Sequence, residues 1–179
     1  MSDQGVIQCV QDSLRELIAD CHAWQNWQGN TWTREQALAH LYHDALPPPP
    51  PKQEAYTIQQ LEKLRPFAII STQAFDGYQV DIDAEFDFRA SGSLHLCIEQ
   101  DRPADLDKDP AEVDRQAKEN IGKLIYSDDP ATPGIVNLAQ NRMRLTRISV
   151  SGPLLPDPEE LKEYGDRCQW IQLAINWRF

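Results

Sequence analysis

The chain has 179 residues, of which 41% are hydrophobic and 25% charged, as in an ordinary globular domain with a hydrophobic core. Its formal net charge of −11 argues against a protein that binds nucleic acid by neutralising phosphates. No run approaches the roughly 20 apolar residues of a membrane span, and the N-terminus lacks the features of a secretory signal. We therefore expect a cytoplasmic site of synthesis, with the four scattered cysteines reduced.

The N-terminal part of the chain predicts two helices. Apolar residues recur at helical spacing and predict the first helix over about residues 3–25. Thr33 and Gln36 have the spacing of a capping box, and we expect the helix that they open to end near Leu46. The chain therefore begins with a helical pair.

Five consecutive prolines, residues 47–51, separate this helical pair from the rest. Prolines cannot donate backbone hydrogen bonds and favour polyproline II, so a stiff spacer is expected, with a ligand for an SH3-like or WW-like domain as the alternative. The predicted organisation is an N-terminal two-helix segment with its polyproline spacer at residues 1–51. An α+β domain is expected to follow at residues 52–179.

Strand and turn signals follow the spacer. After a short helix or turn over about residues 58–64, residues 66–70 predict a strand. Asp76-Gly77 is the strongest hairpin-turn signal in the chain. A two-residue turn there places Phe67 opposite Phe86, with both side chains on the apolar face.

Residues 82–99 alternate apolar and polar almost without error, which predicts β structure with one buried face and one solvent face. Fully extended, this run would span roughly 60 Å at ~3.3 Å per residue, so we expect it to bend at Ser91-Gly92. A two-residue turn at that point would split the apolar set between the faces. Two alternatives keep the apolar residues on one face. One is a three-residue turn over residues 91–93, which pairs Ala90 with Leu94, and the other is a glycine kink in one long strand. Either outcome gives an extended β element that projects from the domain.

The remaining elements are a helix, a loop, two strands and a short helix. Residues 109–126 begin with an N-cap acid followed by proline and predict a helix, and residues 157–160 repeat this device at the start of a short helix. A Pro/Gly loop is expected at residues 130–134, and strands near residues 145–155 and 171–177. The fold class is α+β, a mainly antiparallel sheet with a long β-hairpin packed against helices, plus the N-terminal helical pair.

The sequence contains little that indicates catalysis. Phosphate loops, dinucleotide fingerprints, nucleophile elbows and HExxH motifs are missing from it. Cys21, His40 and His43 are the only group that resembles metal ligands, and satisfied helical histidines are the commoner explanation. We therefore predict no catalytic residue, cofactor or metal, with a small metal-dependent hydrolase as the minor alternative.

Charged residues follow the polar side of the extended β element and the loop after it. At a spacing of two residues, acidic side chains of a strand stand in a row on one face, where they meet solvent, a neighbouring subunit or a channel. The candidate subunit-interface or channel-facing residues are Asp81, Asp83, Glu85, Asp87, Arg89, Glu99, Asp101 and Arg102.

Four segments in the second half of the chain follow one another in a characteristic order. They are a long strand with Arg89 and residues 94–98, a helix containing residues 120–125, the run 145–153, and a closing strand ending in Ile175–Trp177. In the order and texture of these elements, residues 66–179 resemble the tail terminator and head–tail completion proteins of tailed bacteriophages.

The resemblance implies a structural virion protein that assembles into a ring, expected to be a hexamer. The ring would cap the finished tail tube and join it to connector or stopper proteins, and in a contractile tail it would also meet the sheath. DNA would pass through its channel without sequence-specific binding. The resemblance implies no catalytic residue and no membrane partner. Another tail, neck or baseplate component is the alternative within the same class.

Overall fold

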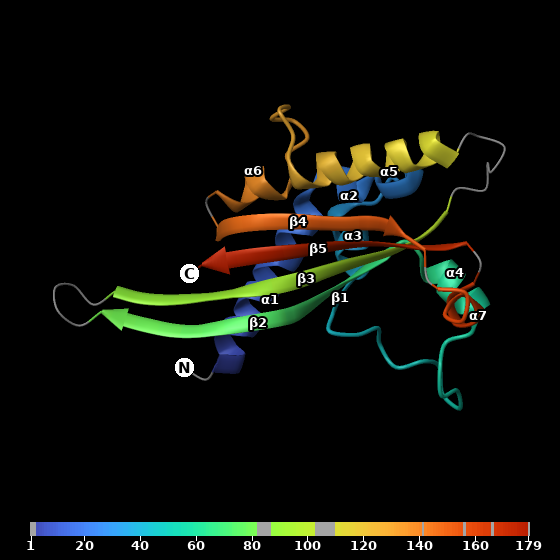
Figure 1. Cartoon of the computed structure of the whole chain (residues 1–179), viewed down its shortest axis with the longest axis horizontal. Helices are drawn as coiled ribbons and strands as arrows, with labels where there is room; N and C mark the ends of the chain where they lie inside the picture. The colour runs from blue at the N-terminus through green and yellow to red at the C-terminus, as the bar shows by residue number, and fades with distance from the viewer. Residues whose placement is uncertain are drawn as a thin grey trace.

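The structure of the chain is a computed structural model that describes residues 3–81, 87–102, 110–140, 142–155, 157–165 and 167–178. A five-stranded sheet is packed with helices (Figure 1). The strands are β1 (Leu41–His43), β2 (Phe67–Asp81), β3 (Asp87–Asp101), β4 (Arg144–Leu154) and β5 (Cys168–Arg178). The helices are α1 (Asp3–Asp20), α2 (His22–Gln25), a 3-10 turn (Trp27–Gly29), α3 (Arg34–Ala39), α4 (Ile58–Leu64), α5 (Pro110–Ile125), α6 (Ile135–Ala139) and α7 (Leu161–Tyr164).

The strand order in the sheet is β1-β2-β3-β5-β4. β1 runs parallel to β2, whereas the other three pairs are antiparallel. The 15-residue strands β2 and β3 form the long hairpin at the centre of this order. The predicted α+β class, with its mainly antiparallel sheet and long hairpin, is therefore confirmed.

The hydrophobic core lies between α1 and one face of the sheet. The apolar stripe of α1 and alternate residues of β3 and β5 are buried together. The helical spacing gives α1 one apolar side, the alternation gives the strands one apolar face, and these two surfaces pack against each other. The core includes Val6, Val10, Leu14, Ile18, Leu94, Leu96, Ile98, Ile171, Leu173 and Ile175. It takes side chains from both sides of the domain boundary expected at residue 51, and that boundary remains a prediction.

The prediction of a hairpin turn at Asp76-Gly77 is wrong. β2 continues through these residues to Asp81, and Phe67 lies opposite Glu99. The pairing of β2 with β3 shifts register at this point, and Gly77 has a φ of 98°. The Asp-Gly pair therefore marks an irregularity inside the hairpin, because bulges and tight turns both favour a glycine with positive φ. Phe86, its expected partner, lies outside the described residues.

Ser91 and Gly92, where a bend or turn was expected, lie within a single strand. β3 continues through these residues to Asp101, so the three-residue turn over residues 91–93 is wrong and the one-strand alternative is correct. A Cβ atom on Gly92 would lie 2.5 Å from the carbonyl oxygen of Ala74 and 2.9 Å from Cζ2 of Trp177. The glycine is therefore needed for a close approach between strands. The beginning of the alternating run, residues 82–86, lies outside the described residues.

The N-terminal helices differ from expectation at their ends. The first is interrupted at Cys21, where α1 gives way to α2. The second ends at Ala39, and the next residues form β1 where helix was expected as far as Leu46. The main chain of this segment hydrogen-bonds to β2, with the Ala68 amide donating to His40 at 2.9 Å, and this long-range pairing outweighs local helix propensity.

The later elements follow the expected order. The helices at α4 and α5 and the strands β4 and β5 lie where the sequence predicts them. The helical turn at α7 follows Asp157, whose carboxylate caps it by accepting hydrogen bonds from the main-chain amides of Glu159 and Glu160. Helix α6 was not expected, because Gly134 and the prolines before it indicate only a loop.

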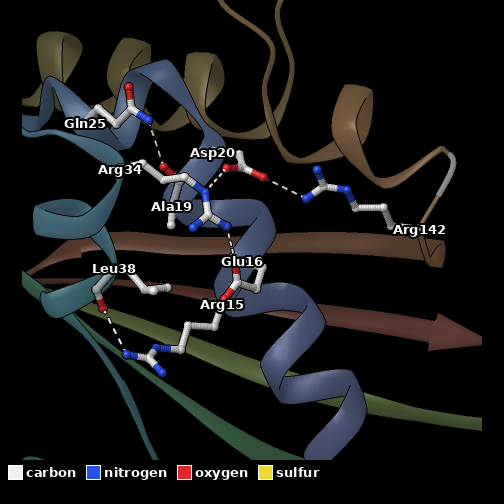
Figure 2. A network of polar contacts seen from close by, with 8 residues as sticks. All are labelled: Arg15, Glu16, Ala19, Asp20, Gln25, Arg34, Leu38 and Arg142. Carbon is white, nitrogen blue, oxygen red and sulfur yellow. Dashed lines mark hydrogen bonds and ion pairs between the residues drawn. The ribbon is translucent and has the colours of Figure 1, made fainter.

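Two arginines join α1 to α3 and to the chain before β4 (Figure 2). Arg34 Nε donates to Asp20 Oδ1 at 2.5 Å and its Nη2 pairs with Glu16, while Arg142 Nη1 donates to Asp20 Oδ2 at 2.7 Å. Burial acts to raise the pKa of Asp20, but the hydrogen bonds from Arg142 and Arg34 outweigh it and hold that pKa below its ordinary value of 3.8.

We expect Asp20→Asn to lower the free energy of unfolding at pH 7 by about 1 kcal/mol, since the amide carries no charge for the two guanidinium groups. Because the folded-state pKa of Asp20 is depressed, its contribution is complete above the unfolded value of 3.8 and is lost as pH falls through the folded value. Urea denaturation of variant and wild type should therefore differ at pH 7 and converge in strong acid. The exposed control Glu54→Gln should show no such convergence, and a pH-independent difference for Asp20→Asn would contradict this origin.

We expect Gly92→Ala to lower the free energy of unfolding by about 1–3 kcal/mol, because the new methyl group would overlap a backbone oxygen that belongs to the sheet. Gly122→Ala is the matched control, since its Cβ would meet nothing within 4 Å on exposed α5 and should stabilise the helix by about 0.5–1 kcal/mol. Urea denaturation measures both changes. Two alanine variants of equal stability would show that the strands at Gly92 are not held at this spacing.

Candidate assembly surface

Among the described residues, no helix covers one face of the sheet over most of its length. α1 crosses the face that carries the core, as Figures 1 and 2 show from different directions. On the opposite face, α7 reaches one end, where Tyr164 packs edge-on against Trp170 with ring centroids 5.3 Å apart. We call this opposite side the open face. Its half-buried or exposed side chains are mostly polar and include Ser71, Ser91, Ser93, His95, Gln172 and Asn176.

The β2–β3 hairpin extends beyond the other strands as a two-stranded arm (Figure 1). β5 ends opposite Ser91, whereas β2 and β3 continue to pair as far as Asp81 and Asp87. Four further residues at about 3.3 Å each give roughly 13 Å of ribbon without a third strand. We call residues 77–81 and 87–91 the arm.

The eight surface residues expected from the sequence fall into separate groups. Three lie on the arm: Asp81, Asp87 and Arg89. Three lie at the other end of β3 or just after it: Glu99, Asp101 and Arg102. Asp83 and Glu85 lie outside the described residues. The two described groups are thus held at opposite ends of the β2–β3 ladder.

Glu99 and Asp101 bind a buried arginine. The side chain of Arg65 is 1% exposed, and its Nε donates to Glu99 Oε1 at 2.8 Å while Nη1 donates to Asp101 Oδ1 at 3.0 Å. Nη2 donates to the main-chain carbonyl of Tyr164. Burial acts to lower the pKa of Arg65, but its hydrogen bond to Glu99 and the surrounding negative charge raise that pKa above its usual value. Both carboxylates therefore have partners within the chain, and the cluster fixes α7 to the sheet.

The charge of Arg65 makes its removal costly. We expect Arg65→Met to lower the free energy of unfolding by about 3–5 kcal/mol, because Glu99 would remain buried without its cation. Arg65→Met/Glu99→Leu should recover part of this loss. Arg115→Met is the control, since its ion pairs with Glu112 and Glu119 lie on the exposed side of α5 and should matter little. If urea denaturation gave the same stability for Arg65→Met and Arg115→Met, the buried cluster would have no stabilising role.

The open face also carries three arginines near the base of the arm, which we call the arginine cluster: Arg144, Arg147 and Arg178. Arg144 lies directly opposite Arg178 in the β4–β5 ladder, and Arg147 lies opposite Asn176. In the described parts of the chain, none of the three has an ion pair or a side-chain hydrogen bond. A recess of about 280 Å³ beside Arg178 is also lined by Asp76 and Arg89. The surface beside the arm is therefore basic, although the whole chain is acidic.

Sequence reasoning missed the arginine cluster. The three residues lie more than 50 positions after the arm in the chain, and only the strand order and register bring them to its base. The sequence did contain one signal for Arg178. Successive side chains of a strand point to opposite faces, so a strand that buries Trp177 must place Arg178 on the other face.

The histidines and cysteine considered as metal ligands are placed separately. Cys21 is buried, which raises the pKa of its thiol to about 12, so it stays protonated. His40 stacks on Trp32 with ring centroids 4.2 Å apart, and His43 Nε2 lies 3.5 Å from Asp12. Across the described residues, no three His, Cys, Asp or Glu side chains are grouped as a metal ion would need.

Comparisons with protein-family models and with curated protein sequences gave no match. None of the helices in the described ranges is long and apolar enough to cross a membrane.

Proposed function

We propose that this protein is a phage tail terminator, a structural virion protein that caps the tail tube with a ring and joins it to the head. Six copies would surround a channel through which DNA passes. The partners would be the tail tube, the connector or stopper proteins and, in a contractile tail, the sheath. The protein would be assembled in the host cytoplasm and reside in the tail or neck of the particle, where it acts by contact and catalyses no reaction.

The arm is the observation that carries this proposal. A two-stranded ribbon with little cover is only marginally stable in water, and its unpaired main-chain edges favour contact with another chain. β1 covers the outer edge of β2 only over residues 68–70, so most of that edge is unpaired in the described part of the sheet. A second copy of the same chain is the partner that such an edge meets in an assembly.

The far edge of the sheet supports the same function. β4 is the last strand in the sheet order, and apolar side chains on it or directly after it are exposed: Val150 (42%), Leu154 (43%) and Leu155 (52%). Exposed apolar groups on an edge strand are typical of a protein–protein contact. An arm and a different complementary edge on one chain give a head-to-tail contact, which closes into a ring when the rotation between copies allows it.

The overall charge agrees with a conduit for DNA. A chain of net charge −11 gives a ring that repels phosphates as a whole. Such a wall leaves DNA free to move along the channel, since strong binding would require many phosphates to be neutralised.

A terminator should form a ring in solution or on tail tubes. We expect size-exclusion chromatography with light scattering to give six times the monomer mass of 20.5 kDa at high concentration, and electron microscopy to show a ring with a central channel. A chain that remains monomeric at high concentration and forms no ring when purified tail tubes are added would overturn the proposal.

The position in the particle separates this function from its nearest alternative. A gold label on the C-terminus should appear at the junction of head and tail, and a label at the far end would indicate a baseplate component. Inactivating the gene should leave heads without tails and tubes of irregular length, because nothing would cap the growing tube. If that mutant produced particles with heads and tails joined normally, the terminator function would be contradicted.

A further inference from the structure

We propose that a polar recess at the end of the sheet opposite the arm binds the carboxylate group of an acidic ligand. The recess has a volume of about 400 Å³, within the usual range of small-ligand pockets. It lies where the end of β3 pairs with the start of β5 (Figure 1), and the 3-10 turn and α5 also line it. The site goes beyond the proposed function and does not depend on it. The lining residues that carry the argument are Trp27, Gln100, Asp101, Arg102, Arg167 and Gln169.

A series of side-chain hydrogen bonds ends at the recess in an unused donor. Trp27 Nε1 donates to Gln100 Oε1 at 2.7 Å, and Gln100 Nε2 donates to Gln169 Oε1 at 2.9 Å. An indole N–H can only donate, so it fixes the oxygen of Gln100 toward Trp27, and the amide nitrogen of Gln100 in turn fixes the oxygen of Gln169. The amide nitrogen of Gln169 is therefore left over, and no acceptor for it is found among the described residues.

The burial of these two glutamines gives the unused donor its significance. Gln169 is 2% exposed and Gln100 is 4% exposed, although glutamine is usually a surface residue. A buried polar group that has lost water without gaining a partner is unfavourable, and most such groups in proteins are satisfied. Because Gln169 lines the recess, an acceptor bound there would supply the partner that its amide nitrogen lacks.

Two arginines bring positive charge to the same recess. Arg102 and Arg167 both line it, and neither has an ion pair with a described residue. Nε of Arg102 is buried without a hydrogen-bond partner, and Nη2 of Arg167 donates only to the main-chain oxygen of Arg102, at 3.1 Å. Among the described lining residues the one acid is Asp101, whose carboxylate already accepts from Arg65 at 3.0 Å. The recess therefore keeps a net positive charge.

A carboxylate fits this set of groups best. It only accepts hydrogen bonds, it carries one negative charge, and it binds a guanidinium group in a bidentate geometry. A neutral amide would leave the arginine charges unbalanced. A phosphate would bring more negative charge beside Asp101, and nucleic acid would bring a whole series of phosphates to a chain of net charge −11. The carboxylate can come from a small dicarboxylate or from an acidic side chain of a partner protein, and both would make the same contacts.

Isothermal titration calorimetry on the full chain tests the site, with glutarate and a capped tetraglutamate peptide as probes. We expect at least one probe to bind with a Kd of about 1 mM or tighter, and neutral glutaramide not to bind. Arg102→Gln/Arg167→Gln should weaken binding at least about 10-fold, because it removes charged donors. Gln169→Met should weaken it about 10-fold, because the methionine side chain has no N–H group to donate. Tighter binding of glutarate would identify a small-molecule ligand, and tighter binding of the peptide an acidic partner protein.

The matched control is Arg144→Gln/Arg147→Gln, which removes two exposed charges from β4, outside the recess, and should bind both probes as wild type does. Urea denaturation checks that each variant folds, and Arg167→Gln, at an exposed residue, replaces the double variant if that one does not. Four results would overturn the site: no binding of either probe in the millimolar range, tighter binding of inorganic phosphate or glutaramide than of glutarate, equal losses in the recess and control variants, or unchanged binding by Gln169→Met. Each of these would leave the proposed function standing, because ring formation does not enter the measurement.

Discussion

The antiparallel pairing of β2 with β3 is the constraint on which the rest of the molecule depends. Its inner half lies within the five-stranded sheet, where β1, β5 and β4 extend it and α1 covers one face. Its outer half continues the same ladder beyond the end of β5. One uninterrupted hydrogen-bonded ribbon thus belongs to the core at one end and to the surface at the other, so the position of the arm is fixed by the packing of Leu94, Leu96 and Ile98.

The two faces of this ribbon differ in composition and burial. The face toward α1 is apolar and buried, and the close approach of Trp177 to Gly92 shows how tightly it is packed. The open face is polar, and the Arg65 cluster at one end uses two of its carboxylates to hold α7. At the other end, Arg144, Arg147 and Arg178 have no ion pair or side-chain hydrogen bond among the described residues.

Local patterns predicted the elements better than the contacts between them. Alternation in residues 87–101 and the Pro110 and Glu112 signals at the start of α5 were sufficient, because those signals are set by neighbours in sequence. The Asp76-Gly77 signal failed because a glycine with positive φ suits a bulge as well as a turn. β1 was missed because its three residues are held by β2, far along the chain. The arginine cluster needed the β4–β5 register, which no local pattern contains.

The net charge of the chain bears on how copies of it could associate. Apolar patches attract any apolar surface, including those of unfolded chains, whereas charged surfaces select a partner by the sign and position of its charges. The overall negative charge opposes association of isolated copies. Under the proposed function, a tail tube that holds several copies side by side would favour their association by raising their effective concentration. Under the proposed function, the charge pattern would favour ring closure on the tube over premature association in the cytoplasm.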